Sequence, residues 1–309
     1  MMITPTPTTL TLGSRTSELA LWQTNHVAEM LQAAWPGLTV HVEPFVTRGD
    51  KTLDRPLPQI GGKGLFTLEL ENALRDGRID LAVHSLKDLP VEDAAGLTLG
   101  AIVGRADVRD VLVAKNGWTL DTLPNGAVVG TSSLRRQAQL LAHRPDLQVK
   151  SIRGNVGTRV RKVQEGEYDA AVLAAAGITR LGLDTFISQW LPLDAMLPAP
   201  GQGALGIQCR ADDANTLRLL AAINNADVHA CVTAERSFLY HLDSGCSTRV
   251  AAHARGGGRA LNLTGVVAAV NGRQLIRVTA DGHDPQALGA KLAQQALAEG
   301  AREVLAGVK

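Results

Sequence analysis

Arginines gather in one segment of the chain, where they could bind an anion. Between residues 131 and 164 the sequence holds eight Lys or Arg residues and one acid, although the formal net charge of the whole chain is only +1. Arginine presents a planar fork of donors that suits a carboxylate or a phosphate, and the chain has 23 Arg against 8 Lys. A compositional bias of the genome would also give that ratio. The positions of the arginines must therefore decide between such a bias and an anion-binding role.

Several of these arginines stand where a helix disfavours them. Arg135 and Arg136 fall in the first turn of one predicted helix, and Arg159 falls similarly in another. A cation there opposes the helix dipole at a cost of a few tenths to about 1 kcal/mol, and a bound anion would remove that penalty. A solvated basic face is the alternative. Because the placement occurs twice, we favour an anion site.

The anion is more plausibly a small molecule than a nucleic acid. Aromatic residues make up 3% of the chain, and none lies between residues 131 and 164, so platforms for base stacking are missing from the basic segment. A polycarboxylate or a phosphate compound fits better. In open α/β sheets such ligands lie beyond the carboxyl ends of the strands, where these arginines fall.

Two other residues could carry chemistry. Lys87-Asp88 follows a predicted strand, and a carboxylate facing a basic cleft could stabilise a cationic intermediate or move a proton; alternatively Asp88 caps a backbone N–H. Cys246 lies in a Ser/Gly loop past a helix, where a thiol can be accessible, although a structural role is the commoner one. Cys209 and Cys231 fall within predicted elements and are expected to be packed.

Other motifs are weak. The Gly-rich segment 61–64 lacks the spacing of a phosphate loop, and GQGALG at 201–206 follows a Pro-rich stretch where a dinucleotide fold needs a strand. The three cysteines have no zinc-ligand spacing and no disulfide framework, which favours a reducing compartment. The N-terminus does not resemble a signal peptide and no apolar run could cross a bilayer. We therefore expect a cytoplasmic protein that binds neither membrane nor nucleic acid, with no metal.

The elements that must position these residues alternate between strand and helix over the first two thirds of the chain. The pattern predicts strands near 10–13, 39–46, 79–83, 127–130, 148–152 and 170–174, and helices near 17–35, 66–76, 134–142 and 158–164. Such alternation implies mostly parallel sheets with helices on both faces. The last third changes to α+β, with a helix at 227–242, a hairpin turning at Asn271-Gly272, and a helix at 285–297.

The ordered motifs of the chain resemble those of the porphobilinogen deaminase (hydroxymethylbilane synthase) family over essentially the whole length. The matching segments are TRGD at 47–50, GGKGLF at 61–66, AVHSLKDLP at 82–90, VGTSSLRR at 129–136, RGNVGTR at 153–159, APGQGA at 199–204, TAER at 233–236 and GC at 245–246. The resemblance implies a transferase of tetrapyrrole biosynthesis. It would join four porphobilinogen units head to tail, release ammonia at each step, and free linear hydroxymethylbilane by hydrolysis.

The resemblance also implies a cofactor and a site. The family carries a covalent dipyrromethane on a cysteine that matches Cys246, and its catalytic aspartate matches Asp88, with Lys87 beside it. Residues that match ligands of cofactor and substrate carboxylates are Arg15, Ser17, Ser85, Lys87, Thr131, Ser133, Arg135, Arg136, Arg153, Arg159 and Arg180. Lys63 and Phe66 match a mobile loop near the active site, to which we assign Asp50 as well, and Gln202 matches a cleft residue.

The fold implied by the resemblance is α/β, with two domains like those of periplasmic binding proteins and a small C-terminal α+β domain. We expect domain 1 at 1–103 with 204–221, domain 2 at 104–203, and domain 3 at 222–309 carrying Cys246. The family is monomeric, and its substrate is a small molecule. The alternative is a non-enzymatic clamshell protein that binds a small polycarboxylate, which would need neither Asp88 nor an accessible Cys246.

One departure from the family pattern concerns the loop around the cysteine. The family shows a second glycine before Gly-Cys and a Val-Pro or similar pair after it, whereas this chain has Ser244 and Ser247-Thr248-Arg249. Replacing Gly and Pro changes the backbone angles that the loop can adopt. Arg249 is either an added carboxylate contact or an exposed residue.

Overall fold

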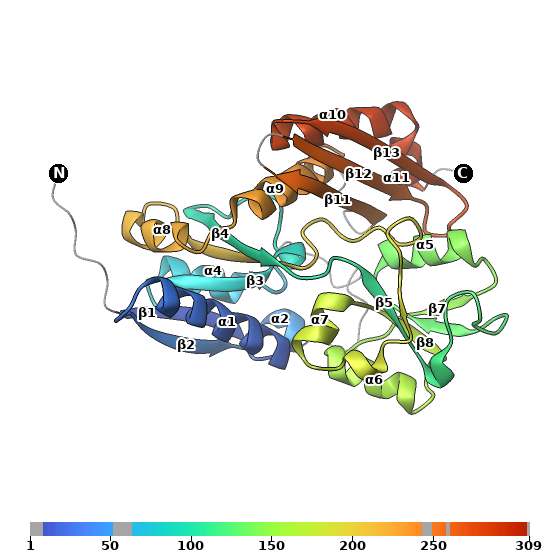
Figure 1. Cartoon of the computed structure of the whole chain (residues 1–309), viewed down its shortest axis with the longest axis horizontal. Helices are drawn as coiled ribbons and strands as arrows, with labels where there is room; N and C mark the ends of the chain where they lie inside the picture. The colour runs from blue at the N-terminus through green and yellow to red at the C-terminus, as the bar shows by residue number, and fades with distance from the viewer. Residues whose placement is uncertain (1–8, 52–63, 243–248, 258–259, 308–309) are drawn as a thin grey trace. The chain divides into compact units, whose positions relative to one another are not determined.

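The computed structural model describes residues 9–51, 64–242, 249–257 and 260–307. The chain forms two compact units (Figure 1). One contains residues 1–105 and 204–229, and the other contains residues 106–203 and 230–309. The chain therefore leaves the first unit after residue 105 and re-enters it at residue 204. The expected boundaries of three domains stay a prediction.

The first unit is built on a five-stranded sheet in the order β2-β1-β3-β10-β4. Its strands are β1 (Thr9–Arg15), β2 (Thr39–Phe45), β3 (Leu81–Ser85), β4 (Leu97–Arg105) and β10 (Ala204–Arg210). Its helices are α1 (Glu18–Ala34), α2 (Arg48–Lys51), α4 (Leu68–Arg75) and α8 (Ala214–Ala221). Leu31 of α1 and Leu219 of α8 share one apolar core with the sheet, and Leu70 of α4 belongs to a second core, so helices cover both faces.

The second unit repeats this layout in the sheet β7-β6-β8-β5-β9. Its strands are β5 (Asp110–Ala114), β6 (Val128–Gly130), β7 (Gln148–Lys150), β8 (Ala170–Ala174) and β9 (Gln189–Trp190). The helices that follow its parallel strands are α5 (Leu134–His143), α6 (Val156–Gln164) and α7 (Ala175–Arg180). Leu140 of α5 packs in one core, and Val160 of α6 and Ile178 of α7 pack in another.

Helices on both faces are confirmed, and the expectation of mostly parallel sheets holds for four of the five strands of each of these two sheets, with β10 and β5 as the exceptions. In the first sheet β1 is parallel to β2 and β3, whereas β10 is antiparallel to both β3 and β4. In the second sheet β6 is parallel to β7 and β8, whereas β5 is antiparallel to β8 and β9. The reason lies in the crossings. Strands β5 and β10 each directly follow a passage of the chain between the units, so no crossover helix sets their direction.

A three-stranded antiparallel sheet, β11-β12-β13, forms the C-terminal part of the second unit. Its strands are β11 (Val250–Gly257), β12 (Ala260–Ala268) and β13 (Leu275–Gly282), and its helices are α9 (Ala226–His241), α10 (Pro285–Ala298) and α11 (Ala301–Ala306). Phe238, Leu263 and Leu292 lie in its core. This confirms the expected α+β character and the hairpin at Asn271-Gly272. Gly272 has φ +73°, and a Cβ there would lie 2.3 Å from the backbone nitrogen of Ala142 in α5.

Candidate functional site

The carboxyl ends of three neighbouring parallel strands bring the first group of predicted residues together. Arg15 ends β1, Ser17 caps α1 directly after it, and Ser85 ends β3. Asp88 lies in the short 3-10 helix 86–88 that follows β3. Parallel neighbours end at the same edge of a sheet, so these residues converge. They line one pocket of about 80 Å³, together with Leu19, Ala20, Gln23, Phe66, Thr67, Val83 and His84.

Arg15 is held in place at this pocket by a carboxylate and an aromatic ring. Its Nε lies 3.3 Å from Oδ2 of Asp50, its Nη2 contacts Oδ1, and its guanidinium carbon lies 4.3 Å from the ring centroid of Phe66. Asp50 also accepts hydrogen bonds from the backbone nitrogen of Thr47, at 3.1 Å, and from its hydroxyl, at 2.7 Å. Burial raises the pKa of Asp50, but the bonds from Arg15 and Thr47 outweigh it and lower the pKa.

Neutral polar groups also line this pocket. The amide of Gln23 donates to the hydroxyl of Ser85 at 2.9 Å. His84 is buried, and burial together with the positive charge of Arg15 lowers its pKa to about 4. Its imidazole is therefore neutral at pH 7. This part of the pocket lining therefore adds no charge to that of Arg15.

Asp88 and Lys87 are exposed, while Leu86 between the strand and this pair is buried. Leu86 anchors the 3-10 turn, so the two charged side chains are presented on its outer side. Asp88 reaches the lining of the pocket, and Lys87 does not. A carboxylate thus stands at the same pocket as Arg15. This arrangement can bind a molecule that has both acidic groups and a positive charge.

In the second unit, the equivalent sheet edge gathers the second group of predicted residues. Thr131, Ser133, Arg135 and Arg136 follow β6, Arg153 and Arg159 follow β7, and Arg180 ends the helix after β8. Strand β6 pairs in parallel with both β7 and β8, so all three carboxyl ends lie at one edge. The fold therefore collects arginines that are up to 45 residues apart in the sequence.

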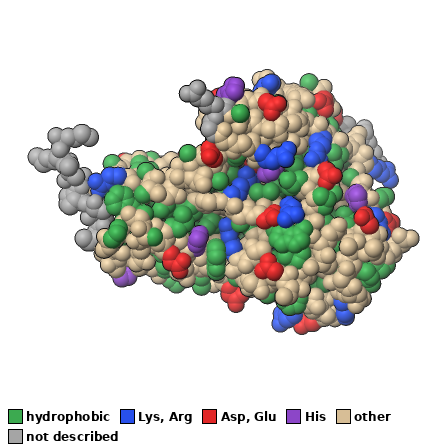
Figure 2. Space-filling model, in the orientation of Figure 1, with side chains coloured by type: hydrophobic (Ala, Val, Ile, Leu, Met, Phe, Trp, Pro, Cys, Tyr) green, Lys and Arg blue, Asp and Glu red, His purple; other side chains and the backbone are tan. Residues whose placement is uncertain are grey.

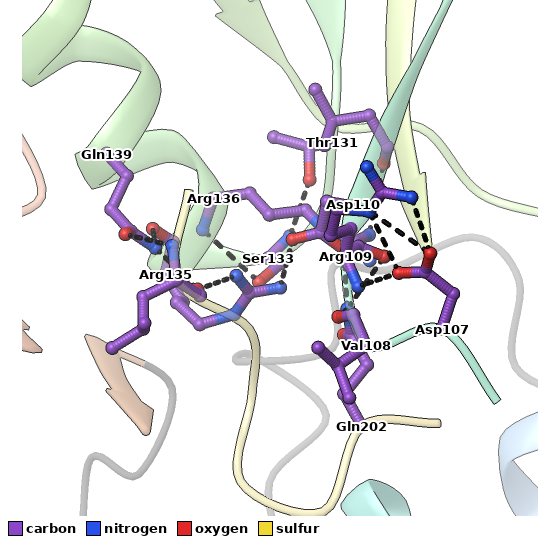
Figure 3. A network of polar contacts seen from close by, with 12 residues as sticks. Asp107, Val108, Arg109, Asp110, Thr131, Ser133, Arg135, Arg136, Gln139 and Gln202 are labelled. Atoms are coloured by element: carbon purple, nitrogen blue, oxygen red, sulfur yellow. Dashed lines mark hydrogen bonds and ion pairs between the residues drawn. The ribbon is translucent and has the colours of Figure 1, made fainter. Parts of the chain in front are cut away.

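Arg135 and Arg136 are buried, and the carboxylate between them is Asp110 (Figure 3). The Nη2 atoms of both arginines donate to Asp110 at 2.8 Å, one to each oxygen. Burial lowers the pKa of Arg135 and raises that of Asp110, but the two guanidinium groups hold the Asp110 pKa well below its usual range. The positions of these arginines in the sequence predict an external anion as their counter-charge. In the structure, the carboxylate that pairs with both arginines is Asp110 of the chain itself.

Sequence reasoning missed Asp110, which is fully buried as the first residue of β5. A signal was present, since an aspartate that opens an apolar strand needs a partner if it is buried. That partner pair is Arg135 and Arg136, about 25 residues further along the chain. The ion pairs of Asp110 with these arginines could not be predicted, because strand β5 was not among the predicted strands.

Gln202 and Arg180 bind to backbone carbonyls near the same cluster. The amide nitrogen of Gln202 lies 2.8 Å from the carbonyl of Val108 and 2.8 Å from Oδ1 of Asp110. Nη2 of Arg180 donates to the carbonyl of Gly203 at 2.8 Å, and burial lowers the Arg180 pKa to about 10. Arg180 therefore keeps its charge at pH 7.

The remaining predicted residues of this edge shape the starts of α5 and α6. Ser133 caps α5, and its backbone nitrogen donates to the hydroxyl of Thr131 at 3.2 Å. Asn155 caps α6 through the backbone nitrogen of Thr158 at 2.8 Å, and Nε of Arg159 donates to the carbonyl of Gly154 at 2.8 Å. Arg153 is half-buried in the loop before α6.

Two predicted residues, Lys63 and Cys246, lie outside the described residues. Arg249, three positions after Cys246, is half-buried, and its role as an added carboxylate contact stays a prediction. Its guanidinium donates to the carbonyl of Val304, at 3.4 Å, and to that of Leu305, both at the carboxyl end of α11. A cation is favourable at a helix C-terminus, so Arg249 fastens one end of the cysteine segment to α11.

Cys209 and Cys231 are buried, as expected for packed residues, and burial raises the pKa of Cys209 to about 11. Within the described residues, no group of three or more His, Cys, Asp or Glu could hold a metal ion. A larger hollow of about 530 Å³ beside Arg255, Asn262 and His283 contains none of the predicted site residues. No helix in the described part of the chain has the length and apolarity to span a membrane.

Comparisons with known proteins match nearly the whole chain to one family. The model of "Porphobilinogen deaminase, dipyromethane cofactor binding domain" matches residues 10–218, and that of the "Porphobilinogen deaminase, C-terminal domain" matches residues 229–298. Curated relatives named porphobilinogen deaminase come from Brevibacillus brevis and a Roseiflexus species. The first is 51% identical over 96% of this chain and 96% of its own length, and the second is 53% identical over 97% and 99%.

Among solved structures, the match to the methionine binding protein MetQ has a TM-score of 0.43 at 14% identity. It covers 72% of this chain and 92% of that chain.

Proposed function

The chain belongs to the porphobilinogen deaminase family, and we propose how its own residues perform the family's reaction. The reaction is a transfer. Four porphobilinogen molecules are joined into linear hydroxymethylbilane, and ammonia is released. The family carries a dipyrromethane cofactor. We propose that this cofactor is attached to Cys246 through a thioether, and that the protein acts as a cytoplasmic monomer.

The observation that carries the proposal is the pocket of the first unit. Arg15, Ser17, Ser85 and Asp88 come from different elements and line the same small space. Porphobilinogen has two carboxylates and an aminomethyl group on a pyrrole ring. Arg15 offers a guanidinium for a carboxylate, and the hydroxyls of Ser17 and Ser85 offer further polar contacts. We assign Lys87, exposed beside Asp88, to a second carboxylate.

Asp88 would stabilise the reacting pyrrole. Loss of ammonia from the aminomethyl group leaves a cation that is spread over the ring, and a fixed carboxylate lowers the energy of such charge as it develops. The ring N–H is also a hydrogen-bond donor, and the carboxylate of Asp88 can accept that bond. Asp88 is exposed at the pocket, whereas Leu86 of the same turn is buried and holds the turn in place. The carboxylate of Asp88 can therefore contact a substrate without a movement of the turn.

The donors of the second unit fit a polycarboxylate cofactor. Nε of Arg136 is buried and has no hydrogen-bond partner among the described residues, so the cluster retains an unused donor. Residues that would hold the cofactor carboxylates are Thr131, Ser133, Arg135, Arg136, Arg153, Arg159 and Arg180, with Gln202 behind them. When bound, dipyrromethane supplies a pyrrole carbon as the nucleophile to which substrate units are added. The arginines would orient it and neutralise its carboxylates.

The alternative of a non-enzymatic clamshell binding protein is not favoured. Relatives named as the enzyme match this chain over nearly its full length at about half identity. A binding protein for a polycarboxylate would also have no use for a carboxylate at the ligand pocket, because Asp88 would repel the ligand.

Replacing Asp88 by Asn tests the assignment. We expect the fold to remain intact, because Asp88 is exposed, and turnover of porphobilinogen to fall roughly 10²- to 10⁴-fold. Asp121→Asn, which changes another exposed aspartate, serves as the control and should leave turnover unchanged. Near-normal turnover of the Asp88 variant would remove this residue from the mechanism.

A further inference from the structure

Asp110, which the resemblance did not single out, accepts three hydrogen bonds within the second unit. We propose that Asp110 is a positioning residue for the cofactor: it fixes the direction of the guanidinium groups of Arg135 and Arg136 and connects them to the segment 199–203. This inference rests on the proposed function, which gives the two arginines a carboxylate ligand.

Both oxygens of Asp110 are engaged (Figure 3). Oδ2 accepts from Nη2 of Arg135 at 2.8 Å, and Oδ1 accepts from Nη2 of Arg136 and from the amide of Gln202, each at 2.8 Å. The carboxylate is fully buried, so water cannot replace a lost partner. Rotating it would therefore break several charge-assisted hydrogen bonds in a site with low dielectric.

Each arginine is also fixed at a second point. Nη1 of Arg135 donates to the carbonyl of Leu197 at 2.5 Å, and Nη1 of Arg136 donates to the carbonyl of Val172 at 3.0 Å. A planar guanidinium that is held at two nitrogens has a fixed plane. The conformational entropy of these side chains is therefore lost when the protein folds and not when a ligand binds.

The charges of the cluster leave room for a ligand anion. One buried carboxylate faces two buried guanidinium groups, so one positive charge is not neutralised within the trio. Isolated charge is costly in a protein interior, and Nε of Arg136 has no hydrogen-bond partner among the described residues. A carboxylate of the cofactor would supply both the missing charge and an acceptor.

A chain of buried contacts continues from the segment of Gln202 to helix α9. The backbone nitrogen of Gly201, next to Gln202, donates to Oε2 of Glu235 at 2.7 Å, and the backbone nitrogen of Ala254 donates to Oε1 at 2.7 Å. Glu235 lies in α9, and α9 ends at His241, shortly before Cys246 in the sequence. The contacts thus link the arginine pair to the helix that leads to the attachment point. A cofactor held at both places needs that spacing to be constant.

The test compares Asp110→Asn and Asp110→Glu with the wild-type chain. Asn keeps the shape but removes the charge, and Glu keeps the charge but moves it by one methylene. Asp107→Asn is the matched control, because Asp107 lies three residues away and makes an exposed ion pair with Arg109. The readouts are the rate at which cofactor-free protein gains the dipyrromethane mass when porphobilinogen is added, and thermal unfolding of the same samples.

We expect both Asp110 variants to load the cofactor on the order of 100-fold more slowly at temperatures where they remain folded, since misplacement by about 1 Å has that effect. The Asp107 variant should load like the wild type. Wild-type loading by folded Asp110→Asn would overturn the inference. Should that variant not fold, Asp110→Glu decides, and its loading at the wild-type rate would show that charge alone matters, which also overturns the inference. A wild-type chain that never gains the mass would contradict the proposed function instead.

Discussion

Arg15 and Arg136 show two different ways in which this fold holds an arginine for an anionic ligand. Arg15 keeps about a quarter of its side chain exposed and is paired with Asp50 at the rim of a pocket. Arg136 is almost entirely buried and is paired with Asp110 inside the second unit. The first can adjust when a ligand arrives, because water can solvate what it releases. The second is fixed in advance, because any movement would leave a charge unpaired.

At the residue scale we also predict a pH dependence caused by His84. Its pKa in the folded protein is about 4, below the usual 6.5, because it is buried. The unfolded chain therefore binds one more proton than the folded chain between pH 4 and 6.5. Stability should fall as pH is lowered through that range, by on the order of 3 kcal/mol for this group, and should be insensitive to His84 above pH 7.

Urea unfolding of the wild type and of His84→Gln between pH 4 and 8 measures this effect. The variant should show a shallower loss of stability below pH 6.5 than the wild type. His26→Gln, which changes an exposed histidine of α1, should preserve the wild-type slope. Equal slopes for all three proteins would contradict the assignment of a neutral His84 to the pocket wall.

At the scale of elements, the same design appears in both units. Each sheet sets three parallel strands side by side, and the polar residues stand where these strands end and the next helix or turn begins. Ser17, Ser133 and Asn155 cap the helices that follow β1, β6 and β7. The caps supply acceptors to backbone N–H groups of the first helical turn. They therefore also fix the orientation of that turn and of the side chains on it.

We predict that Asn155→Ala destabilises the protein by about 1 kcal/mol, because α6 loses the acceptor for the backbone nitrogen of Thr158. The change should also slow cofactor loading, since Arg159 lies in the first turn of that helix. Asn155→Asp retains an acceptor oxygen and should keep most of the stability. Denaturant unfolding and intact mass measure the two effects. Equal stability of the Ala and Asp variants would show that the cap contributes nothing.

The alternating elements could be predicted from the sequence because each strand and helix of a βα unit has its own apolar period. The predicted pattern matches α1, α5, α6 and the hairpin of β12 and β13. Strands β4 and β5 were not predicted, and their antiparallel pairing depends on segments far away in the chain. Missing β5 also meant missing Asp110, because a buried ion pair is a property of the tertiary fold.

At the scale of the whole molecule, the local excess of positive charge is smaller than the sequence window implied. At least five of the eight basic residues between 131 and 164 pair with acids: Arg135 and Arg136 with Asp110, Arg144 with Asp146, Arg161 with Glu165, and Lys162 with Glu167. Glu165 and Glu167 lie just outside the window, Asp146 lies within it, and Asp110 lies 21 residues before it. On the face drawn in Figure 2, basic and acidic side chains are interspersed. Ion pairing within the fold therefore offsets most of the positive charge of this window.

The central claim is that this chain builds a pyrrole chain on a cysteine and holds it with arginines. Intact mass spectrometry of the purified protein tests it most directly, with Cys246→Ser as the reference. We expect the wild type to exceed the mass of the reference by about two linked pyrrole units, beyond the difference of one atom between sulfur and oxygen. A mass difference no larger than that of the sulfur-to-oxygen exchange, after reconstitution with porphobilinogen as well, would contradict this function.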